Sequence, residues 1–214
     1  MKTDDLISLL ATGVAPVAPK VAIRYLLSAS AVAALGALLL ALGVYGLRPD
    51  IDQMLTDPLY WSKLAFPLAL SAGAFVVTTR LSRPATAIGS TRAALLALPV
   101  VVLWLAAIAD YRFAAPDSRD ALLMGHTWRT CPVNIALLSV PGFVAFMKAL
   151  GSLAPTRLRS AGAAAGLLAG AVATLAYCLH CPEMGVPFWA VWYVLGIAIP
   201  TAAGALLGPR MLRW

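Results

Sequence analysis

The residues of this 214-residue chain that could do chemistry are three cysteines and two histidines. Cys131 follows His126 in the segment GHTWRTCP, and Cys178 and Cys181 enclose His180 in the segment CLHCPE. Thiolate and imidazole together form a soft ligand set that suits zinc, cadmium or copper. The same thiols could instead close a disulfide in an oxidising compartment. We expect no permanent cofactor at such a site, and at most a transient heavy-metal ion.

Taken one at a time, these residues have simpler explanations. A cysteine near a membrane surface is more often a small buried hydrophobe, and a histidine there is usually only amphipathic. The convergence of all five onto one face of the predicted bundle favours a metal or redox site. Cys131 and Cys181 each precede a proline at a predicted helix start, where the helix N-terminus lowers the pKa of a thiol.

An alternative reading comes from the C-x-x-C spacing of Cys178 and Cys181, which is typical of thiol oxidoreductases. A membrane thiol-disulfide oxidoreductase would need two interacting thiol pairs, and three cysteines cannot supply two pairs. We therefore expect that the chain is not an enzyme.

The elements that must position these residues are membrane helices. Hydrophobic residues make up 61% of the chain and charged residues only 12%, against about 25% charged in soluble proteins. This composition excludes a soluble enzyme, a disordered tail and a secreted disulfide scaffold. Six continuous apolar runs approach the roughly 20 residues that cross a bilayer as a helix: Ile23–Leu47, Leu64–Leu81, Ala93–Ala109, Asn134–Leu150, Ala161–Cys178 and Val186–Leu207. The predicted fold is an all-α bundle of six transmembrane helices over residues 23–207, because runs without alternation argue against a barrel.

The distribution of charge predicts the orientation of the bundle. Of the 16 lysines and arginines, only five fall on the side of the predicted loops 48–63, 110–133 and 179–185: Arg48, Lys63, Arg112, Arg119 and Arg129. By the positive-inside rule, both termini, including the end 208–214, lie in the cytoplasm and the three loops lie outside. The basic residues form no run that would follow a phosphate backbone, so we expect no direct contact with nucleic acid.

Within the predicted spans, small and polar residues give further expectations. Gly162, Gly166 and Gly170 form a smooth stripe that lets a neighbouring helix approach. Prolines inside three spans predict kinks: Pro99, Pro141 and Pro200. Away from the helix ends we find no ionisable side chain of the kind that a small-solute transporter keeps near the bilayer centre, which argues against that alternative. Aromatic residues beside the outer loops, such as Tyr60, Tyr177 and Tyr193, are expected to form an interfacial belt.

The tail 1–22 contains a short amphipathic helix candidate. Asp4 and Asp5 stand in its first turn, and Leu6, Leu9 and Leu10 share one face. Helices that lie on membranes usually carry basic residues on the polar face. An acidic helix points instead to a basic protein partner, with a merely solvated tail as the simpler alternative.

Segments spread along the chain are similar to one family. They are MKTDDLI at the start, KLAFPL from residue 63, WRTCPVNI from residue 128, APTRLR from residue 154, HCPE from residue 180 and GPRMLRW at the end. Their order and sequence resemble the NrsF family of bacterial inner-membrane anti-sigma factors, which have six spans.

The resemblance implies that the protein holds an extracytoplasmic-function sigma factor inactive at the membrane. It further implies that two periplasmic cysteines, matching Cys131 and Cys181, sense heavy metal or oxidative stress and trigger release. Cys178 falls outside the family pattern, and the resemblance assigns no ligand role to His126 or His180. We expect the tail, through its acidic turn and leucine face, to contact the sigma factor, and we expect Cys131 and Cys181 to lie close together.

Overall fold

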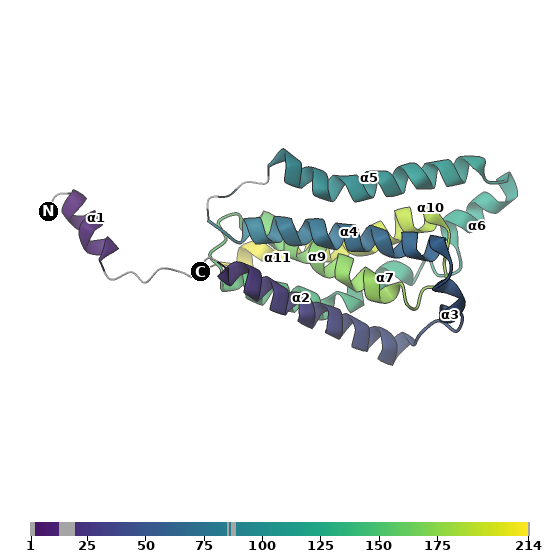
Figure 1. Cartoon of the computed structure of the whole chain (residues 1–214), viewed down its shortest axis with the longest axis horizontal. Coiled ribbons are helices and arrows are strands. Elements are labelled where there is room, and N and C mark those ends of the chain that lie inside the picture. Colours follow the sequence, from purple (N-terminus) through teal and green to yellow (C-terminus); the bar gives the residue numbers. More distant parts are fainter. Residues whose placement is uncertain (1–2, 13–19, 85, 87–88, 214) are drawn as a thin grey trace.

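The computed structural model describes residues 3–12, 20–84, 86 and 89–213, and within these residues all regular secondary structure is helical (Figure 1). The all-α prediction is confirmed. The helices are α1 (Thr3–Ala11), α2 (Val21–Leu40) with its π-helical extension η1 (Ala41–Tyr45), α3 (Ile51–Met54), α4 (Pro58–Leu81), α5 (Ser90–Phe113), η2 (Pro116–Ser118), α6 (Arg119–Met124), α7 (Cys131–Leu138), α8 (Val140–Gly151), α9 (Leu158–Tyr177), α10 (Val186–Phe188), η3 (Trp189–Tyr193) and α11 (Val194–Met211).

Five helical segments are long and apolar enough to cross a membrane, and a sixth candidate is the bent pair α7 and α8. The five are Val21–Tyr45, Pro58–Leu81, Ser90–Phe113, Leu158–Tyr177 and Val186–Met211. The pair bends by 42° at Ser139. Pro141 lies in the first turn of α8 and has no N–H to continue the helical ladder, which explains why the predicted fourth span is broken.

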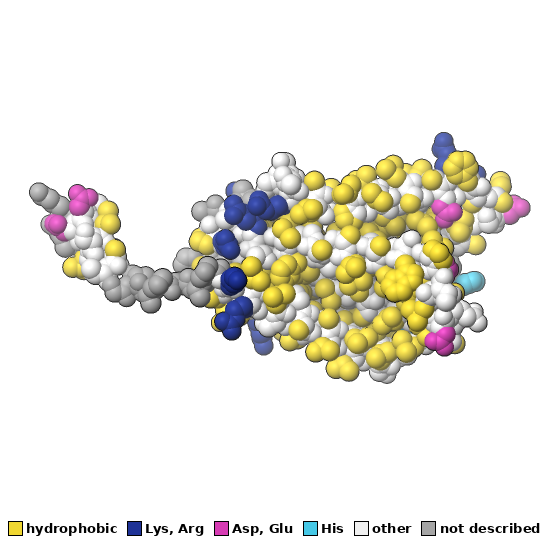
Figure 2. All heavy atoms as spheres, in the orientation of Figure 1, with side chains coloured by type: hydrophobic (Ala, Val, Ile, Leu, Met, Phe, Trp, Pro, Cys, Tyr) yellow, Lys and Arg dark blue, Asp and Glu magenta, His cyan; other side chains and the backbone are white. Residues whose placement is uncertain are grey.

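The long helices run between two ends of the bundle (Figure 1). The end at which α2 begins and α11 finishes is called the terminal end. The opposite end, which carries the connections 46–57, 114–130 and 178–185, is called the loop end. Lysine and arginine side chains gather near the terminal end on the face shown in Figure 2.

Helix α4 begins at Pro58, earlier than the predicted start at Leu64. The side chain of Asp57 accepts a hydrogen bond from the Leu59 backbone N–H at 2.8 Å, and proline fits the first turn. This cap starts the helix in a segment that is too polar to be recognised as part of a membrane span from its hydropathy. Lys63, which we expected in an external loop, therefore lies inside α4.

Helix α9 is the most enclosed of the five long helices, although it is also the least apolar. It packs against α2, α4, α7, α8 and, most extensively, α11. A side chain at Gly166 would overlap the backbone of Pro200, and one at Gly162 would overlap the backbone of Gly204. The glycine stripe thus serves close packing of α9 on α11, as its spacing predicted.

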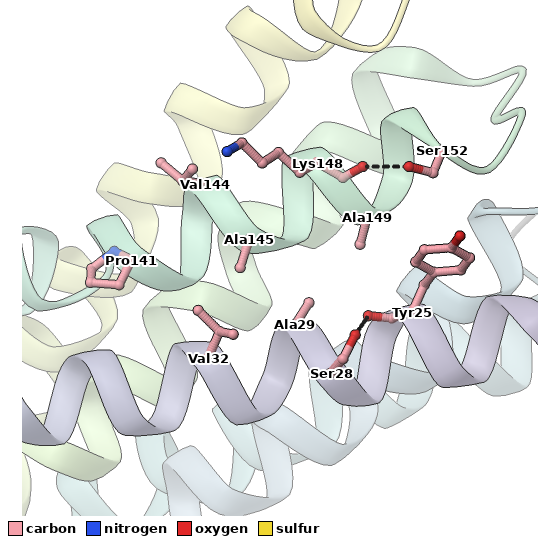
Figure 3. Close-up of a pocket in the computed structure, with 10 residues that line it drawn as sticks. All are labelled: Tyr25, Ser28, Ala29, Val32, Pro141, Val144, Ala145, Lys148, Ala149 and Ser152. Atoms are coloured by element: carbon pink, nitrogen blue, oxygen red, sulfur yellow. Dashed lines mark hydrogen bonds between the residues drawn. The ribbon is translucent and has the colours of Figure 1, made fainter.

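On the outer surface, α2 and α8 leave a groove of about 390 Å³ between them (Figure 3). Short side chains, including Ala29 and Ala145, line it, and the hydroxyl groups at its edge bond to carbonyls of their own helices. The groove is a shallow and mainly apolar surface of the kind that acyl chains cover in a membrane.

Candidate functional site: a buried thiol cluster at the loop end

The three cysteines lie together at the loop end, and all are free thiols with no exposed surface. Cys131 is the first residue of α7, Cys178 follows the last residue of α9, and Cys181 lies in the connection from α9 to α10. They belong to one hydrophobic cluster, in which the thiols of Cys131 and Cys181 are electrostatic neighbours. The fold therefore places in one cluster the two cysteines that we expected to be close; a bond or a shared metal between them stays a prediction.

The thiol cluster is enclosed by aromatic side chains. Tyr60, Tyr177 and Tyr193 are fully buried there, so the expectation that they form an interfacial belt is wrong. The rings close the loop end of the bundle around the thiols instead of facing the membrane surface. The hydroxyl groups of Tyr60 and Tyr193 are buried and have no hydrogen-bond partner among the described residues.

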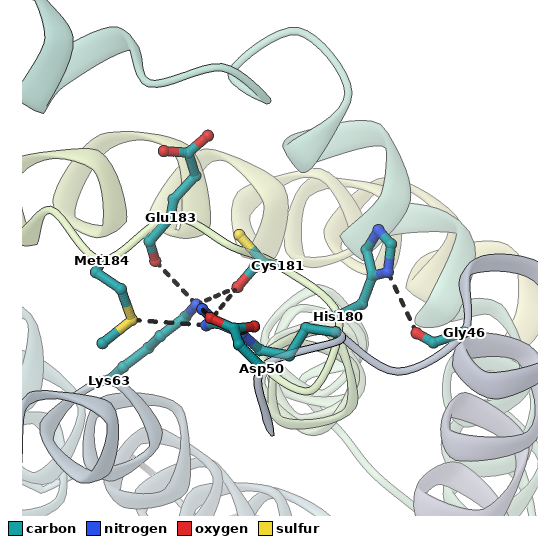
Figure 4. A network of polar contacts seen from close by, with 8 residues as sticks. Gly46, Asp50, Lys63, His180, Cys181, Glu183 and Met184 are labelled. Atoms are coloured by element: carbon teal, nitrogen blue, oxygen red, sulfur yellow. Dashed lines mark hydrogen bonds and ion pairs between the residues drawn. The ribbon is translucent and has the colours of Figure 1, made fainter. Parts of the chain in front are cut away.

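Lys63 is a fully buried cation next to this cluster. Its Nζ donates hydrogen bonds to the carbonyl oxygen of Cys181 at 2.7 Å and to that of Glu183 at 2.9 Å (Figure 4). The ammonium also lies 5.9 Å from the centre of the Tyr193 ring. Sequence reasoning missed this residue because hydropathy assigned it to a loop; the Asp57-Pro58 helix start was the signal that could have found it.

Arg48, in the connection 46–57, contacts the same segment around Cys181. Its backbone N–H donates to the Leu179 carbonyl at 3.1 Å, and its guanidinium lies 3.4 Å from the Cys181 carbonyl. The guanidinium also makes two hydrogen bonds of 2.7 Å to the Asp50 carboxylate. These bonds raise the pKa of Arg48 and lower the pKa of Asp50.

Glu183 joins the two segments that carry Cys131 and Cys181. Its Oε1 accepts hydrogen bonds from the backbone N–H groups of His126 at 2.7 Å and Thr127 at 3.0 Å, and from the Thr127 hydroxyl at 3.2 Å. Gly125 has a φ of 54°, and a side chain there would meet the carboxylate. The position thus favours glycine on both grounds. The sequence showed Glu183 only as one acid among several, and no spacing signal pointed to this role.

The histidines do not join the thiols in a metal-binding group. His126 is exposed and contributes its backbone N–H to Glu183, whereas the His180 Nδ1 lies 3.2 Å from the Gly46 carbonyl. Among the residues that the structure describes, no group of three or more histidine, cysteine or acidic side chains is arranged to hold a metal ion. A soft metal ion suits the thiols chemically, but binding it would require the connection around Cys181 to rearrange.

Burial also changes the reactivity expected for these thiols. Cys178 lies just beyond the end of α9, and desolvation raises its pKa to about 12. The thiolate is the reactive and metal-binding form, so in this closed arrangement Cys178 is protected rather than activated.

Helix α1 lies at the other extreme of exposure. The amphipathic helix predicted in the tail forms over Thr3–Ala11 and buries none of its residues. Leu6, Leu9 and Leu10 are exposed, and Figure 1 shows the helix apart from the bundle. The apolar face formed by the three leucines is thus exposed.

Comparison with known proteins identifies the family. Residues 10–214 match the family described as NrsF, negative regulator of sigma F. The chain belongs to the NrsF family. It is 49% identical over 215 residues to the probable anti-sigma-F factor NrsF of Azospira oryzae, and 37% identical over 222 residues to the anti-sigma-F factor NrsF of Caulobacter vibrioides. Both alignments cover 100% of each chain.

No solved structure matches the chain. Membership in NrsF confirms the family predicted from the six sequence segments. NrsF is a family of regulators and not of enzymes, so the thiol-disulfide oxidoreductase considered as an alternative is removed.

Proposed function

We propose that this chain is a multi-pass membrane anti-sigma factor that binds a sigma factor of the sigma-F kind at its terminal end. Membership in NrsF over nearly the whole chain is the observation that carries this proposal. The extracytoplasmic-function class of the sigma factor is part of the proposal and follows from the resemblance described above.

The proposed contact with the sigma factor is α1, together with the basic terminal end. The helix exposes Leu6, Leu9 and Leu10 on one face, and a leucine face of this kind suits helix-in-groove recognition. Asp4 and Asp5 in its first turn would pair with a basic surface. The positive-inside rule supports placing this end in the cytoplasm, where a sigma factor is found.

The first test replaces Leu6, Leu9 and Leu10 with serine. A reporter gene that depends on the sigma factor should switch on without inducer, because the apolar anchors are lost. Ser8→Ala is the control, since Ser8 is exposed and lies on the face of the helix away from the three leucines. Full repression by the triple variant would exclude α1 as the contact and direct attention to the connections near Arg83 and Arg157.

We further propose that Cys131 and Cys181 sense heavy metal or oxidant outside the membrane. Bridging them would pull the start of α7 toward the start of α10, and rigid helices would carry the shift to the terminal end. Coupling of about 1 to 3 kcal/mol would weaken binding of the sigma factor roughly 5- to 150-fold. Cys178, which already lies in the thiol cluster, stays an auxiliary candidate, as do His126 and His180, which could enter the site only after rearrangement.

The second test measures binding of the sigma factor to the purified protein with and without cadmium or oxidant. Cadmium or oxidant should weaken binding to the wild type but not to the Cys131→Ser, Cys181→Ser double variant. Cys178→Ser is the matched control and should keep the response. An equal response in wild type and double variant would show that sensing resides elsewhere.

A further inference from the structure

The connection around Cys181 is fastened through its backbone rather than through its side chains. The Cys181 carbonyl accepts from Lys63 at 2.7 Å and from Arg48 at 3.4 Å. The Glu183 carbonyl accepts from Lys63 at 2.9 Å and from the Trp189 indole at 3.1 Å. In Figure 4 the carbonyl of Cys181 faces Lys63. Lys63 is the one donor that both carbonyls share.

The buried ammonium group of Lys63 is in turn stabilised by the carbonyl groups of this connection. The side chain has no exposed surface, and a buried ammonium is costly unless its donors are satisfied. Among the described residues no carboxylate lies within ion-pair distance of Lys63, so the two carbonyls take that role. Arg48 differs because Asp50 neutralises it whether or not the connection stays in place.

Reaction at Cys181 requires this arrangement to open. The thiol is fully buried, and no metal-binding group is preformed among the described residues. Movement of the connection would give a reagent or ion access to the sulfur, and that movement breaks the hydrogen bonds to Lys63 unless the cation follows.

We propose that Lys63 is a positioning residue, a latch that keeps Cys181 buried and sets how readily its thiol reacts. The inference rests on the proposed function, in which Cys181 is a sensor. The effect of Lys63, a residue of α4, on access to the Cys181 thiol can be measured without inducer or sigma factor.

The test measures alkylation of the full-length protein by N-ethylmaleimide in membrane vesicles. One background carries Cys131→Ser and Cys178→Ser, so that only Cys181 reacts, and a second background keeps only Cys131. Lys63→Met should accelerate alkylation of Cys181 about tenfold or more, because a latch held by a charged donor is removed. The rate at Cys131 should rise clearly less than the rate at Cys181, because the side-chain hydrogen bonds of Lys63 go to the connection around Cys181 and not to the segment that carries Cys131.

Two further variants give the controls. Lys63→Arg keeps a charged donor and should restore a rate close to that of the wild type, which a role in packing alone would not predict. Lys148→Met removes a lysine from the last turn of α8 and should leave both rates unchanged. Lys63→Gln gives a second measurement if the methionine variant fails to insert, and it too should accelerate Cys181.

The outcomes separate this proposal from the sensing function. An unchanged rate at Cys181 in the folded Lys63 variants would overturn the latch, and so would an equal rise at Cys131 and Cys181, which indicates general loosening. If alkylation follows the prediction but cadmium never releases the sigma factor, the latch stands and thiol sensing fails. If cadmium acts normally while Lys63→Met leaves Cys181 protected, sensing stands and the latch fails.

Discussion

At the scale of single residues, Glu183 has two separate connections to the site. Its carbonyl accepts from Lys63 and Trp189, whereas its carboxylate accepts three hydrogen bonds from the segment that precedes Cys131. A side-chain substitution therefore removes only the second connection. Substitution of Glu183 can therefore test how much its carboxylate stabilises the contact between the two cysteine-bearing segments, because the hydrogen bonds to the Glu183 carbonyl remain.

Glu183→Ala should lower the free energy of unfolding by about 1.5 to 3 kcal/mol, the range for a hydrogen bond that involves a charged group. Thermal unfolding in detergent, followed by near-ultraviolet circular dichroism, measures the change. Asp117→Ala is the matched control, because Asp117 is exposed in η2 and its loss should change stability by no more than about 0.5 kcal/mol. Equal effects of the two substitutions would contradict a structural role for the carboxylate.

The ion pair of Arg48 and Asp50 predicts a pH dependence. Hydrogen bonding to Arg48 lowers the pKa of Asp50 below its ordinary value of 3.8, so the folded state favours the ionised carboxylate. The stabilisation is complete above the ordinary pKa and is lost as the pH falls through the lowered one. The melting temperature should therefore decrease when the pH is lowered below about 4. The Asp50→Asn substitution should remove part of that decrease. Asp52→Asn is the control, and a wild-type pH profile in Asp50→Asn would refute the assignment.

At the scale of elements, the contact between α9 and α11 depends on the absence of side chains. Gly162 and Gly166 lie against the backbone of α11, where an added Cβ would overlap it. By contrast, a Cβ on Gly151 at the end of α8 would meet no atom within 4 Å. The same substitution should therefore have opposite consequences at these positions.

Gly166→Ala should destabilise the bundle by at least about 1 to 3 kcal/mol, the usual cost of overpacking. Gly151→Ala should be neutral or slightly stabilising, since alanine favours a helix over glycine by roughly 1 kcal/mol. Thermal unfolding and yield from membranes give the comparison. A melting temperature of Gly166→Ala at or above that of Gly151→Ala would show that α9 and α11 separate without cost.

At the scale of the whole molecule, the distribution of charge predicts one orientation in the membrane. A fluorescent-protein fusion after residue 214 should be bright, because that domain folds in the cytoplasm, and an alkaline phosphatase fusion there should be inactive. Phosphatase fused within the connection 114–130 should be active, because this connection is expected outside. The reverse pattern would place the thiol cluster on the cytoplasmic side and remove the basis for sensing outside the cell.

The sequence predicted the helical architecture, five of the six spans as continuous helices, and the helix in the tail. Each of these follows from averages or periods over many residues. It did not predict Lys63 or Glu183, because their partners are mainly backbone groups that come close only when α4, the connection after α9 and the segment before Cys131 meet. Nor did it predict that Tyr60, Tyr177 and Tyr193 would be buried. The sequence pattern of an aromatic residue near a helix end is the same whether its ring faces lipid or packs inside a bundle.

The enclosure of α9 has a consequence for how the chain enters the membrane during synthesis. This helix is the least apolar of the five long ones and α5 is the most apolar, while their burial has the reverse order. A segment such as α5 partitions into lipid by itself, whereas α9 gains less from lipid and more from neighbouring helices. Because α2, α4, α7 and α8 precede α9 in the chain, four of its five neighbours have already been synthesised when α9 leaves the translocon. The last neighbour, α11, follows, so insertion of the final two helices completes the interior of the protein.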